Sequence, residues 1–421
     1  MRVCVVGSGG REAALALVLG RTADDVVVVP GNPGIPGSVP GPPQDVDADL
    51  YVIGPEVPLV DGLADELRAA GRLVFGPGAD GARLEGSKAW MKEVLAAADV
   101  PTARYGIFDS VEPALAYLRS LPGPWVVKTD GLAAGKGVLV TDDLAAAEQD
   151  VRDKLSGAAF GAAGRTVVVE EGLIGPEVSV FAVCDGHRAV ALEPAQDFKR
   201  VGDGDVGPNT GGMGAYSPLP WLPDGFAQDV VDRFVAPTLA ELRRRGIDYR
   251  GALYAGLILT AEGPKLLEYN VRFGDPDSQV VLLRLTSDLT ALLASAAAGR
   301  LEGEPTYEPG AAVLVVAASE GYPVAPRLGD PIEGLEAAAA EDGVTVLCAG
   351  VGAGADGTLA TAGGRVIDVV GRGADLAEAR RRAYAGLAHL SWPGLHHRHD
   401  IAAGVSAPAG TDRTDEEATP R

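Results

Sequence analysis

Cysteine is scarce in this sequence, and the few cysteines that occur exclude the common cysteine-based sites. Cys4, Cys184 and Cys348 stand singly in apolar, strand-like runs. They lack the paired spacing of a zinc site, and their odd number argues against a disulfide framework. We therefore expect three buried free thiols in a protein of the reducing cytoplasm.

Long apolar runs are missing as well. No stretch approaches the roughly 20 apolar residues that a membrane-spanning helix needs. The start of the chain, MRVCVVGSGG, turns glycine-rich too soon for a signal peptide. These absences predict a cytoplasmic protein without a membrane partner.

Basic residues are outnumbered, with 36 Lys and Arg against 58 Asp and Glu and a net charge of −22. A nucleic-acid partner is excluded, because such a surface needs a positive footprint. A phosphate-bearing ligand must instead be held locally, by backbone N–H groups, a few basic side chains or metal ions.

What the chain has in plenty is glycine and proline, 57 and 30 residues, gathered in discrete loops. Its 421 residues suffice for two to four domains. Strands and helices alternate over residues 1–102, which predicts an open parallel sheet. The strands are expected in the apolar run 3–6 and in the stretches 24–34, 49–59 and 72–78, with a helix at 60–71.

The rest of the chain has a different pattern. Residues 103–312 predict an antiparallel α+β body with a small lid subdomain at about 122–188, where PWVVKTDGLAAGKGVLVTDD indicates a hairpin with a long glycine loop. Residues 313–405 predict a small C-terminal α+β domain with a helix at 375–390. The polar tail 406–421 is expected to be disordered.

Two glycine- and acid-containing turns follow strands of the predicted parallel sheet. GSGGRE joins a strand to a helix N-terminus, where backbone N–H groups favour an anion. It lacks the G-x-G-x-x-G spacing, so a nicotinamide cofactor is not expected. GPEVPL should lie on the same rim of the sheet. A small phosphate, a sugar phosphate or a plain tight turn fits the first motif. Sugar hydroxyls bound by Glu56, or simply an acid that leads a helix, fit the second. The candidates are Gly9, Gly10, Arg11, Glu12, Pro55 and Glu56.

Three lysines are candidates for binding phosphate. Lys88 begins a predicted helix, Lys128 ends an apolar strand, and Lys136 lies in the glycine loop that follows. The loop is not a Walker A motif, because strands flank it and no Ser or Thr follows the lysine. A solvated helix position is the alternative for Lys88.

The stretch VVVEEGLIGPEVSV places acids at the end of a buried strand. Such a hinge can offer backbone groups to an adenine and a carboxylate to a ribose, although a solvated turn fits equally. The candidates are Glu170, Glu171, Leu173 and Glu177.

DGDVGPNTGGMGAYSP predicts a loop that closes over a ligand. It has few side chains and is expected to present unpaired N–H groups, and Met213 and Tyr216 would be unusual in a free linker. The candidates are Asn209, Thr210, Gly211, Gly212 and Met213.

The stretch LEYNVRFGDPDSQ alternates like a strand, with Glu268, Asn270 and Arg272 on one face. Carboxylate and amide oxygens suit Mg²⁺, and a guanidinium suits a carboxylate. An ordinary solvated strand face is the alternative when this stretch is taken alone.

In this order, the motifs resemble those of the ATP-grasp superfamily and, within it, of the phosphoribosylamine–glycine ligase family. The resemblance covers residues 1 to about 401. It rests most strongly on NTGGMGAYSP together with RFGDP, besides GSGGRE, LEGSKAWMK and KTDGLAAGKGV.

The resemblance implies an N-terminal sugar-phosphate domain, an ATP-grasp body with a lid and a C-terminal domain. It implies that Lys88 and Lys128 bind phosphates, that Glu170 and Leu173 match an adenine hinge, and that Glu177 contacts ribose. It further implies Mg²⁺ or Mn²⁺ on Glu268 and Asn270, and glycine beside Arg272 and Asp275. Arg272, Lys128 and Asp275 are the expected catalytic residues.

The implied reaction joins glycine to 5-phosphoribosylamine with ATP, through a glycyl phosphate, and gives glycinamide ribonucleotide, ADP and phosphate. A monomer with only small-molecule partners is expected. The chain departs from the family pattern at Ala13 and Phe198, where histidine is usual, and at DPDSQ, where DPETQ is usual. The alternatives are another ATP-grasp carboxylate–amine ligase and a non-catalytic nucleotide-binding relative. His389, His396, His397 and His399 are expected to be surface residues and not metal ligands.

Overall fold

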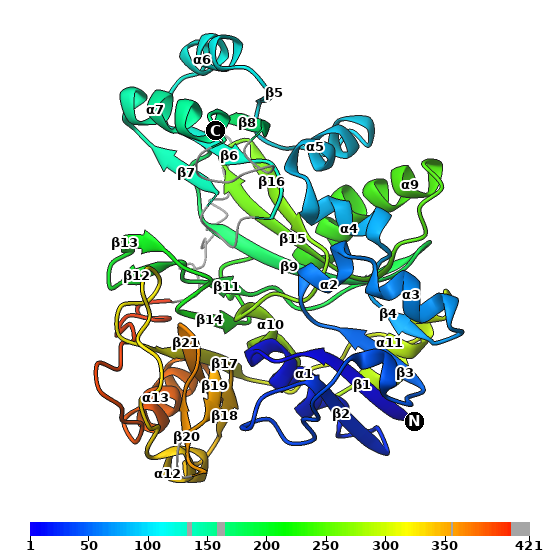
Figure 1. The fold of residues 1–421 in the computed structure, drawn as a ribbon, viewed down its shortest axis with the longest axis vertical. Coiled ribbons are helices and arrows are strands. Elements are labelled where there is room, and N and C mark those ends of the chain that lie inside the picture. Colours follow the sequence, from blue (N-terminus) through cyan, green and yellow to red (C-terminus); the bar gives the residue numbers. More distant parts are fainter. Residues whose placement is uncertain (133–136, 158–164, 355–356, 406–421) are drawn as a thin grey trace, which may run out of the picture.

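The computed structural model describes residues 1–132, 137–157, 165–354 and 357–405. Lys136 and the predicted disordered tail 406–421 lie outside these residues. Figure 1 shows the N-terminal unit and the C-terminal unit at one end of the molecule and a small subdomain at the other.

The N-terminal unit contains the predicted open parallel sheet. Its strands are β1 (Arg2–Gly7), β2 (Asp25–Pro30), β3 (Leu50–Ile53) and β4 (Val74–Phe75), in the order β2-β1-β3-β4. All pairings are parallel, and β1 and β3 are almost wholly buried, as their continuous apolar runs predict. Helix α1 (Gly10–Leu19) follows β1.

The single helix predicted at 60–71 is wrong in its limits. The structure has α2 (Glu56–Val60) and α3 (Leu63–Ala69), separated at Gly62, whose φ is +92°. This left-handed conformation ends one helix and starts the next, and it suits glycine. Two more helices lead into the body: α4 (Ala79–Gly86) and α5 (Lys88–Ala97).

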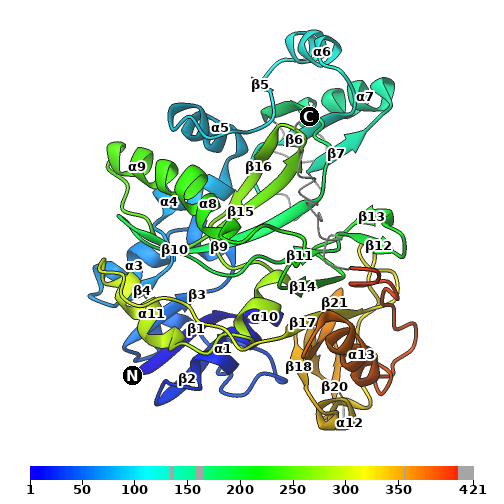
Figure 2. The same cartoon turned by 180° about the vertical axis from the view of Figure 1, so that it is seen from behind.

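The body is built on an antiparallel sheet in the order β10-β9-β15-β16. These strands are β9 (Glu177–Asp185), β10 (Ala189–Ala191), β15 (Arg250–Thr260) and β16 (Gly263–Asn270). The helices that accompany this sheet are α8 (Phe226–Val230), the π-helical turn η3 (Val231–Val235), α9 (Ala236–Arg244), α10 (Asp277–Leu282) and α11 (Leu289–Ala297). Figure 2, seen from behind, shows α8 and α9 lying across one face of the sheet.

The small subdomain has its own antiparallel sheet, in the order β5-β8-β6-β7, and its own apolar core. Its elements are β5 (Tyr105–Phe108), α6 (Val111–Ser120), β6 (Trp125–Thr129), β7 (Val138–Thr141), α7 (Leu144–Leu155) and β8 (Val167–Glu171). The predicted hairpin is confirmed, because β6 and β7 pair directly. β5 and α6 precede residue 122, the predicted start of the lid subdomain, and pack in this subdomain. β9 falls within the predicted range of about 122–188 but belongs to the larger sheet.

The C-terminal unit holds a five-stranded sheet in the order β11-β14-β17-β21-β18. Its members are β11 (Gln196–Asp197), β14 (Gly214–Ser217), β17 (Ala311–Ala318), β18 (Val344–Cys348) and β21 (Arg365–Gly373). The short hairpins are β12 (Arg200–Gly202) with β13 (Val206–Asn209) and β19 (Val351–Ala353) with β20 (Leu359–Thr361). Helices α12 (Leu335–Ala340) and α13 (Leu376–Leu387) complete the unit, and the Asp375 side chain caps α13.

Residues 203–218 do not form the single loop that the sequence predicts. Strands β13 and β14 lie within this stretch, and β14 pairs with β17 of the C-terminal sheet. Met213 and Tyr216 are almost fully buried, and this burial explains their presence among glycines. The motif thus joins the body to the C-terminal unit.

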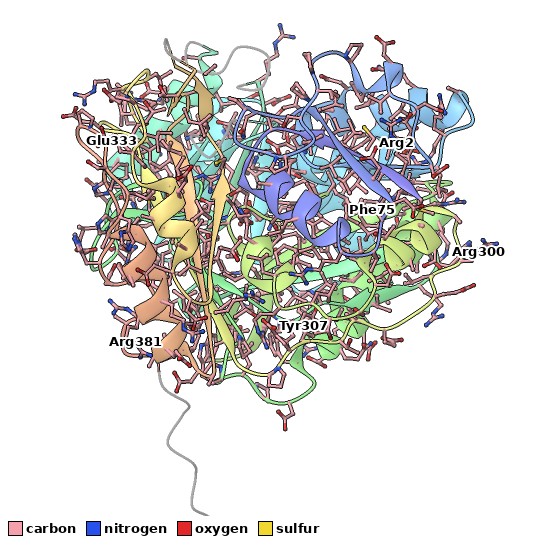
Figure 3. The ribbon with its side chains drawn as sticks, turned by 90° about the horizontal axis from the view of Figure 1, so that it is seen from below. Arg2, Phe75, Arg300, Tyr307, Glu333 and Arg381 are labelled. Atoms are coloured by element: carbon pink, nitrogen blue, oxygen red, sulfur yellow. The ribbon has the colours of Figure 1, made fainter. Side chains whose placement is uncertain are left out.

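One continuous apolar core links the N-terminal unit, the body and the C-terminal sheet. Phe273 is central, with ring centroids 6.1 Å from Phe75 and 6.2 Å from Phe181. Seen from below, the N-terminal and C-terminal units lie side by side (Figure 3), and Phe75 is buried. Asn32 bonds across this contact, donating from Nδ2 to the carbonyl oxygens of Cys348 and Ala349.

All three cysteines are buried free thiols, as predicted. Burial raises the pKa of Cys4 to about 12 and that of Cys348 to about 11, so neither is a reactive thiolate. Among the described residues, no helix has the length and apolar character that crossing a membrane requires.

Candidate active site

A cavity of about 660 Å³ lies where the small subdomain, the body, the rim of the N-terminal sheet and the C-terminal unit meet. It collects most of the site residues that the sequence predicts. Those that line it are Arg11, Pro55, Glu56, Lys88, Lys128, Glu170, Glu171, Leu173, Glu177, Asn209, Thr210, Gly211, Glu268, Asn270, Arg272 and Asp275. Five others lie outside its wall: Gly9, Gly10, Glu12, Gly212 and Met213.

One end of the cavity is rich in lysine. Lys88 is the first residue of α5, and its Nζ donates to the Gly131 carbonyl oxygen at 3.0 Å. Burial lowers its pKa, although the nearby Glu268 carboxylate opposes this shift. Lys128 on β6 donates from Nζ to the Leu267 carbonyl oxygen at 3.2 Å. Two cations therefore face the same half of the cavity.

Glu170 on β8 lies between Lys128 and a further lysine, Lys92, which is not among the residues predicted from the sequence. Its carboxylate oxygens are 3.1 Å from Lys128 Nζ and 3.2 Å from Lys92 Nζ. Burial lowers the pKa of Lys92 to about 8, although Glu170 raises it. The signal for Lys92 is its spacing, because positions 88 and 92 lie on one face of a helix. The Glu170 side chain is thus engaged by these two lysines.

The neighbouring acids of this end also have partners. The Glu171 carboxylate pairs with Arg104 Nε at 2.6 Å. Glu177 pairs with Lys199, a cavity residue that is not among those predicted from the sequence, and Lys199 Nζ is 4.0 Å from Asp197 Oδ1. Burial raises the pKa of Asp197 to about 8, although Lys199 lowers it.

Glu268 and Asn270 line the cavity from β16, as the alternation of this strand predicts. Burial raises the pKa of Glu268, but Lys199, Lys128 and Lys88 lower it more, so the carboxylate is ionised. Within the described part of the chain, this carboxylate has no hydrogen bond or ion pair. An ionised carboxylate next to an amide oxygen fits a hard cation such as Mg²⁺, which fills its remaining positions with phosphate oxygens and water.

The other end of the cavity is formed around Arg272. Its Nη2 lies 2.8 Å from Glu85 Oε1, and its Nε lies 3.3 Å from Glu56 Oε2. Burial raises the pKa of Glu56, but Arg272 and Arg11 reverse that shift and lower the pKa overall. Burial dominates for Glu85, whose pKa is raised. No local sequence pattern predicts a role for Glu85, since its partner Arg272 lies far away in the chain.

Glu12 supports the glycine-rich turn from behind the cavity wall. Its carboxylate accepts from the Gly9 N–H at 2.7 Å and from Arg11 Nε at 2.6 Å. A side chain at Gly54 would overlap this carboxylate, so the glycine at the end of β3 is explained by Glu12. Arg11 itself reaches the cavity and donates to the Phe273 carbonyl oxygen at 3.1 Å.

The prediction that the Asn209–Met213 loop presents unpaired N–H groups is wrong. The N–H groups of Thr210 and Met213 donate to the carbonyl oxygens of Lys199 and Phe198. The Gly211 N–H donates to Tyr322 Oη at 3.0 Å, and the Gly212 N–H donates to Thr210 Oγ1 at 2.9 Å. The loop is fixed because a strand follows it directly, and its glycines face Arg365 and Pro276.

The histidines near the end of the described chain hold structural contacts. His396 Nε2 bonds the Val201 carbonyl oxygen at 2.8 Å, and His399 Nδ1 bonds Asp203 at 2.9 Å. His389 pairs with Glu341. No group of three or more His, Cys, Asp and Glu arranged for a metal ion occurs in residues 1–132, 137–157, 165–354 and 357–405.

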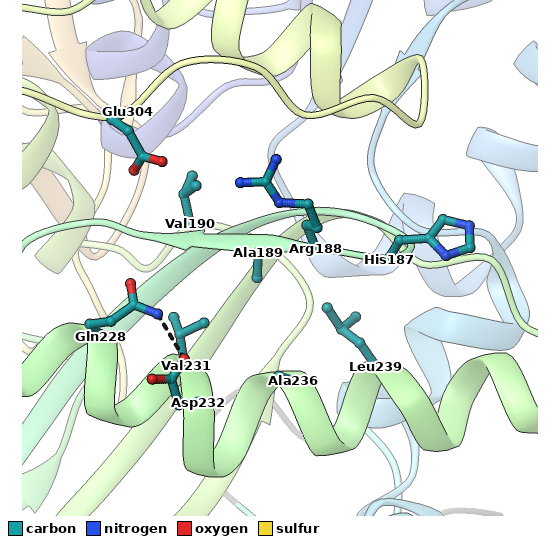
Figure 4. Close-up of a pocket in the computed structure, with 10 residues that line it drawn as sticks. All are labelled: His187, Arg188, Ala189, Val190, Gln228, Val231, Asp232, Ala236, Leu239 and Glu304. Atoms are coloured by element: carbon teal, nitrogen blue, oxygen red, sulfur yellow. Dashed lines mark hydrogen bonds between the residues drawn. The ribbon is translucent and has the colours of Figure 1, made fainter.

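A second cavity, of about 420 Å³, lies apart from this site, between the β9–β10 hairpin and the η3–α9 helical segment. Figure 4 shows Arg188 and Glu304 on one side and the hydrogen-bonded pair Gln228 and Asp232 on the other. These polar side chains are exposed, and the cavity receives none of the predicted site residues.

Models of three domains of one family match successive parts of the chain. The N domain of phosphoribosylglycinamide synthetase matches residues 1–85, its ATP-grasp (A) domain matches residues 86–278, and its C domain matches residues 312–404. The limits that the sequence predicts for the domains, 1–102, 103–312 and 313–405, stay a prediction.

Relatives of known name are similar over nearly the whole chain. The phosphoribosylamine–glycine ligase of Mycobacterium tuberculosis is 50% identical over 432 residues, covering 97% of this chain and 99% of the relative. That of Streptomyces coelicolor is 49% identical over 422 residues, covering 96% and 99%.

Solved structures agree with the fold. The phosphoribosylamine–glycine ligase of Thermotoga maritima has a TM-score of 0.85 and 34% identity, and the match covers 96% of this chain and all of that one. The biotin carboxylase domain of Hydrogenobacter thermophilus 2-oxoglutarate carboxylase, at 17% identity and a TM-score of 0.71, shares the fold alone. Together with the three domain matches, these likenesses establish that this chain belongs to the phosphoribosylglycinamide synthetase family of ATP-grasp proteins.

Proposed function

We propose that this chain joins glycine to 5-phosphoribosylamine at the expense of ATP, giving glycinamide ribonucleotide, ADP and phosphate, as a step of purine biosynthesis. The observation that carries the proposal is a single cavity with lysines at one end and arginines at the other, joined by the segment from Glu268 to Asp275. Such a cavity suits a reaction between a nucleoside triphosphate and two smaller substrates.

The lysine end suits ATP. Lys88 and Lys128 bring positive charge to the phosphates, and Glu170 holds Lys128 in place. The turn that contains Leu173 and the carboxylate of Glu177 suits the adenine and the ribose. Positioned cations of this kind lower the barrier to phosphoryl transfer by neutralising charge, so no nucleophilic side chain is needed.

Glu268 and Asn270 are the proposed ligands of Mg²⁺ or Mn²⁺, as their ionised and amide oxygens suit a hard cation. When bound there, the ion neutralises charge on the ATP phosphates. The positive lysines offset the negative charge of the triphosphate, which the acidic chain would otherwise repel. The negative charge of Glu268 offsets that of the bound cation.

The arginine end suits glycine and the sugar phosphate. Arg272 is proposed to hold the glycine carboxylate in line with the γ-phosphate of ATP. To do so, its guanidinium would release Glu56 or Glu85 and pair with the substrate instead. A carboxylate oxygen of glycine attacks the γ-phosphorus. The bond from the γ-phosphorus to the oxygen of ADP breaks, and glycyl phosphate forms. The rim that carries Arg11, Pro55 and Glu56 suits the ribose phosphate.

In the second step, the amine nitrogen of phosphoribosylamine attacks the carbonyl carbon of glycyl phosphate. The bond from that carbon to the phosphate oxygen breaks, and the departing phosphate takes up the proton that the amine nitrogen loses. Asp275, with its pKa lowered by Arg365 and Arg11 against the effect of burial, is an ionised carboxylate at this end. It is proposed to orient the attacking amine by accepting a hydrogen bond. A cytoplasmic location and a monomeric state are part of the proposal.

The test is ADP release by the purified protein with Mg-ATP and glycine, with and without phosphoribosylamine formed in situ from ribose 5-phosphate and ammonia. We expect release to need both substrates and to give a product with the mass of glycinamide ribonucleotide. Release with a different amine or acid would identify another carboxylate–amine ligase. ATP binding without release in any mixture would identify a non-catalytic relative.

A further inference from the structure

Arg365, the first residue of β21 in the C-terminal unit, reaches across to the wall of the cavity. Its Nη1 donates to the Gly211 carbonyl oxygen at 2.8 Å and to the Asp275 carbonyl oxygen at 2.9 Å. Its Nη2 lies 3.3 Å from Asp275 Oδ1. One guanidinium therefore joins the Asn209–Gly212 loop to the turn that carries Asp275, and both of these segments line the arginine end.

The glycines of this loop fit the guanidinium closely. A side chain at Gly211 would meet Arg365 Cζ at 3.0 Å and would push the guanidinium away, so glycine lets the planar group lie close to the loop. At Gly212 the backbone has a φ of +119°, which disfavours other residues, and a side chain there would also overlap Pro276. Gly211 is thus explained by the contact with Arg365, and Gly212 by its backbone conformation and by Pro276, without a bound ligand.

Tyr322, also of the C-terminal unit and also lining the cavity, holds the same loop. Its hydroxyl oxygen accepts the Gly211 N–H at 3.0 Å. The Tyr322 ring lies against Gly364, the residue before Arg365, where a side chain would overlap the ring. Gly211 is therefore held at its N–H by Tyr322 and at its carbonyl by Arg365.

A second link from β21 reaches the same turn. Gln279 Nε2 donates to Asp275 Oδ1 at 3.0 Å and to Asp368 Oδ2 at 3.1 Å. The Asp275 carboxylate is thus fixed by Arg365 on one side and, through Gln279, by Asp368 on the other. Among the residues that the structure describes, the hydrogen bonds and the ion pair of Arg365 are all to the arginine end, and none is to Lys88, Lys128 or the Glu170 segment.

We propose that Arg365, assisted by Tyr322, is a positioning residue through which the C-terminal unit sets the geometry of the amino-substrate end of the cavity and not of its nucleotide end. The inference rests on the proposed function, since it presumes that glycine and phosphoribosylamine react beside Asp275. Arginine is required because its fork bonds several acceptors at once, and the lysine ammonium cannot reproduce that arrangement.

The test compares R365M and R365K with the wild-type protein in steady-state ligation, with each substrate varied in turn. We expect kcat/KM for glycine and for phosphoribosylamine to fall on the order of 10²-fold in both variants, because a displacement near 1 Å at a reacting group has about that effect. The KM for ATP and the midpoint of thermal unfolding are expected to stay near the wild-type values. Y322F, which loses only the hydroxyl acceptor, should show the same pattern more weakly.

The matched controls are R372M and R372K. Arg372 lies on the same strand and pairs with Glu308 at 2.9 Å, but it does not line the cavity. We expect these controls to ligate normally. Normal kcat/KM for both amino substrates in R365M would overturn the inference. It would also be overturned if R365K and Y322F lost ATP affinity or folding stability to the same extent as they lose kcat/KM for the amino substrates. Failure of the wild-type protein to ligate would instead overturn the proposed function.

Discussion

Lys128 and Glu170 form a buried ion pair at the lysine end of the cavity, with Nζ and Oε2 3.1 Å apart. The pair joins the neighbouring strands β6 and β8. Because Lys92 approaches the other carboxylate oxygen, one acid balances two bases in a region that water scarcely reaches. The position of a proposed phosphate-binding lysine thus depends on an acid that need not touch the nucleotide.

Replacing Glu170 by glutamine tests this dependence. In Glu170→Gln, Lys92 and Lys128 would face each other without a counter-charge, and breaking a buried pair typically costs about 3–5 kcal/mol. We expect the free energy of unfolding in urea to fall by that amount. Glu171→Gln is the matched control, because its partner Arg104 is 62% exposed and a surface pair contributes about 0–1 kcal/mol. Equal losses in the two variants would contradict the account.

Glu268→Gln tests the proposed metal site. The variant keeps the shape of the side chain but removes the charge that a hard cation needs. We expect kcat to fall on the order of 10²–10³-fold, and the Mg²⁺ dependence of ADP binding, measured by calorimetry, to weaken. Glu262→Gln is the control, since Glu262 is exposed in the turn before the same strand. Unchanged Mg²⁺ dependence in Glu268→Gln would rule out this ligand.

Arg272→Ala tests the proposed carboxylate contact. Without the guanidinium, Glu56 and Glu85 lose their shared partner and glycine has no cation to hold it. We expect ligation to fall on the order of 10²–10³-fold while ATP still binds. Arg233→Ala, which removes an exposed arginine paired with Asp229, should ligate normally. Near-normal turnover of Arg272→Ala would show that another group holds glycine.

Asp368 gives a pH-dependent prediction. Burial and the nearby Asp275 raise the pKa of Asp368 to about 7, although Arg365 and Gln279 lower it. The unfolded chain ionises such a group near pH 4, about its usual value. The folded state therefore holds the extra proton between these values, and the stabilisation that protonation gives is lost as pH rises through 7.

Asp368→Asn cannot ionise, so this loss should be absent from the variant. We expect its free energy of unfolding, minus that of the wild type, to rise between about pH 4 and 7 by up to about 1.4 kcal/mol per pH unit. Urea unfolding at several pH values measures the difference. Asp342→Asn, at an exposed side chain, is the control for the charge change itself. A difference that stays constant with pH would contradict the raised pKa.

Local patterns in the sequence predict the strands and the residues at their ends. The alternation of Glu268 and Asn270, the strand end at Lys128 and the turn at Pro55 each depend on a few neighbouring residues, and the structure brings all of them to one cavity. The hairpin of β6 and β7 was predictable for the same reason. Periodicity and turn chemistry are local, so one sequence suffices.

Partners from distant segments could not be predicted in this way. Lys92 meets Glu170, Glu85 meets Arg272, and Arg365 meets Gly211 only because separate units of the chain pack together. The sequence predicts that the glycines at 211 and 212 belong to a ligand-binding loop, whereas the structure explains them by Arg365 and Pro276. A glycine pattern reveals that something lies close, but not what it is.

The central claim, that the glycine carboxylate attacks the γ-phosphate of ATP before the amine attacks carbon, is tested most directly with glycine labelled in its carboxylate with oxygen-18. The protein would be incubated with labelled glycine, Mg-ATP and phosphoribosylamine, and the released phosphate examined by mass spectrometry. The account predicts that each phosphate gains one labelled oxygen from glycine. Phosphate free of label, formed together with glycinamide ribonucleotide, would contradict it.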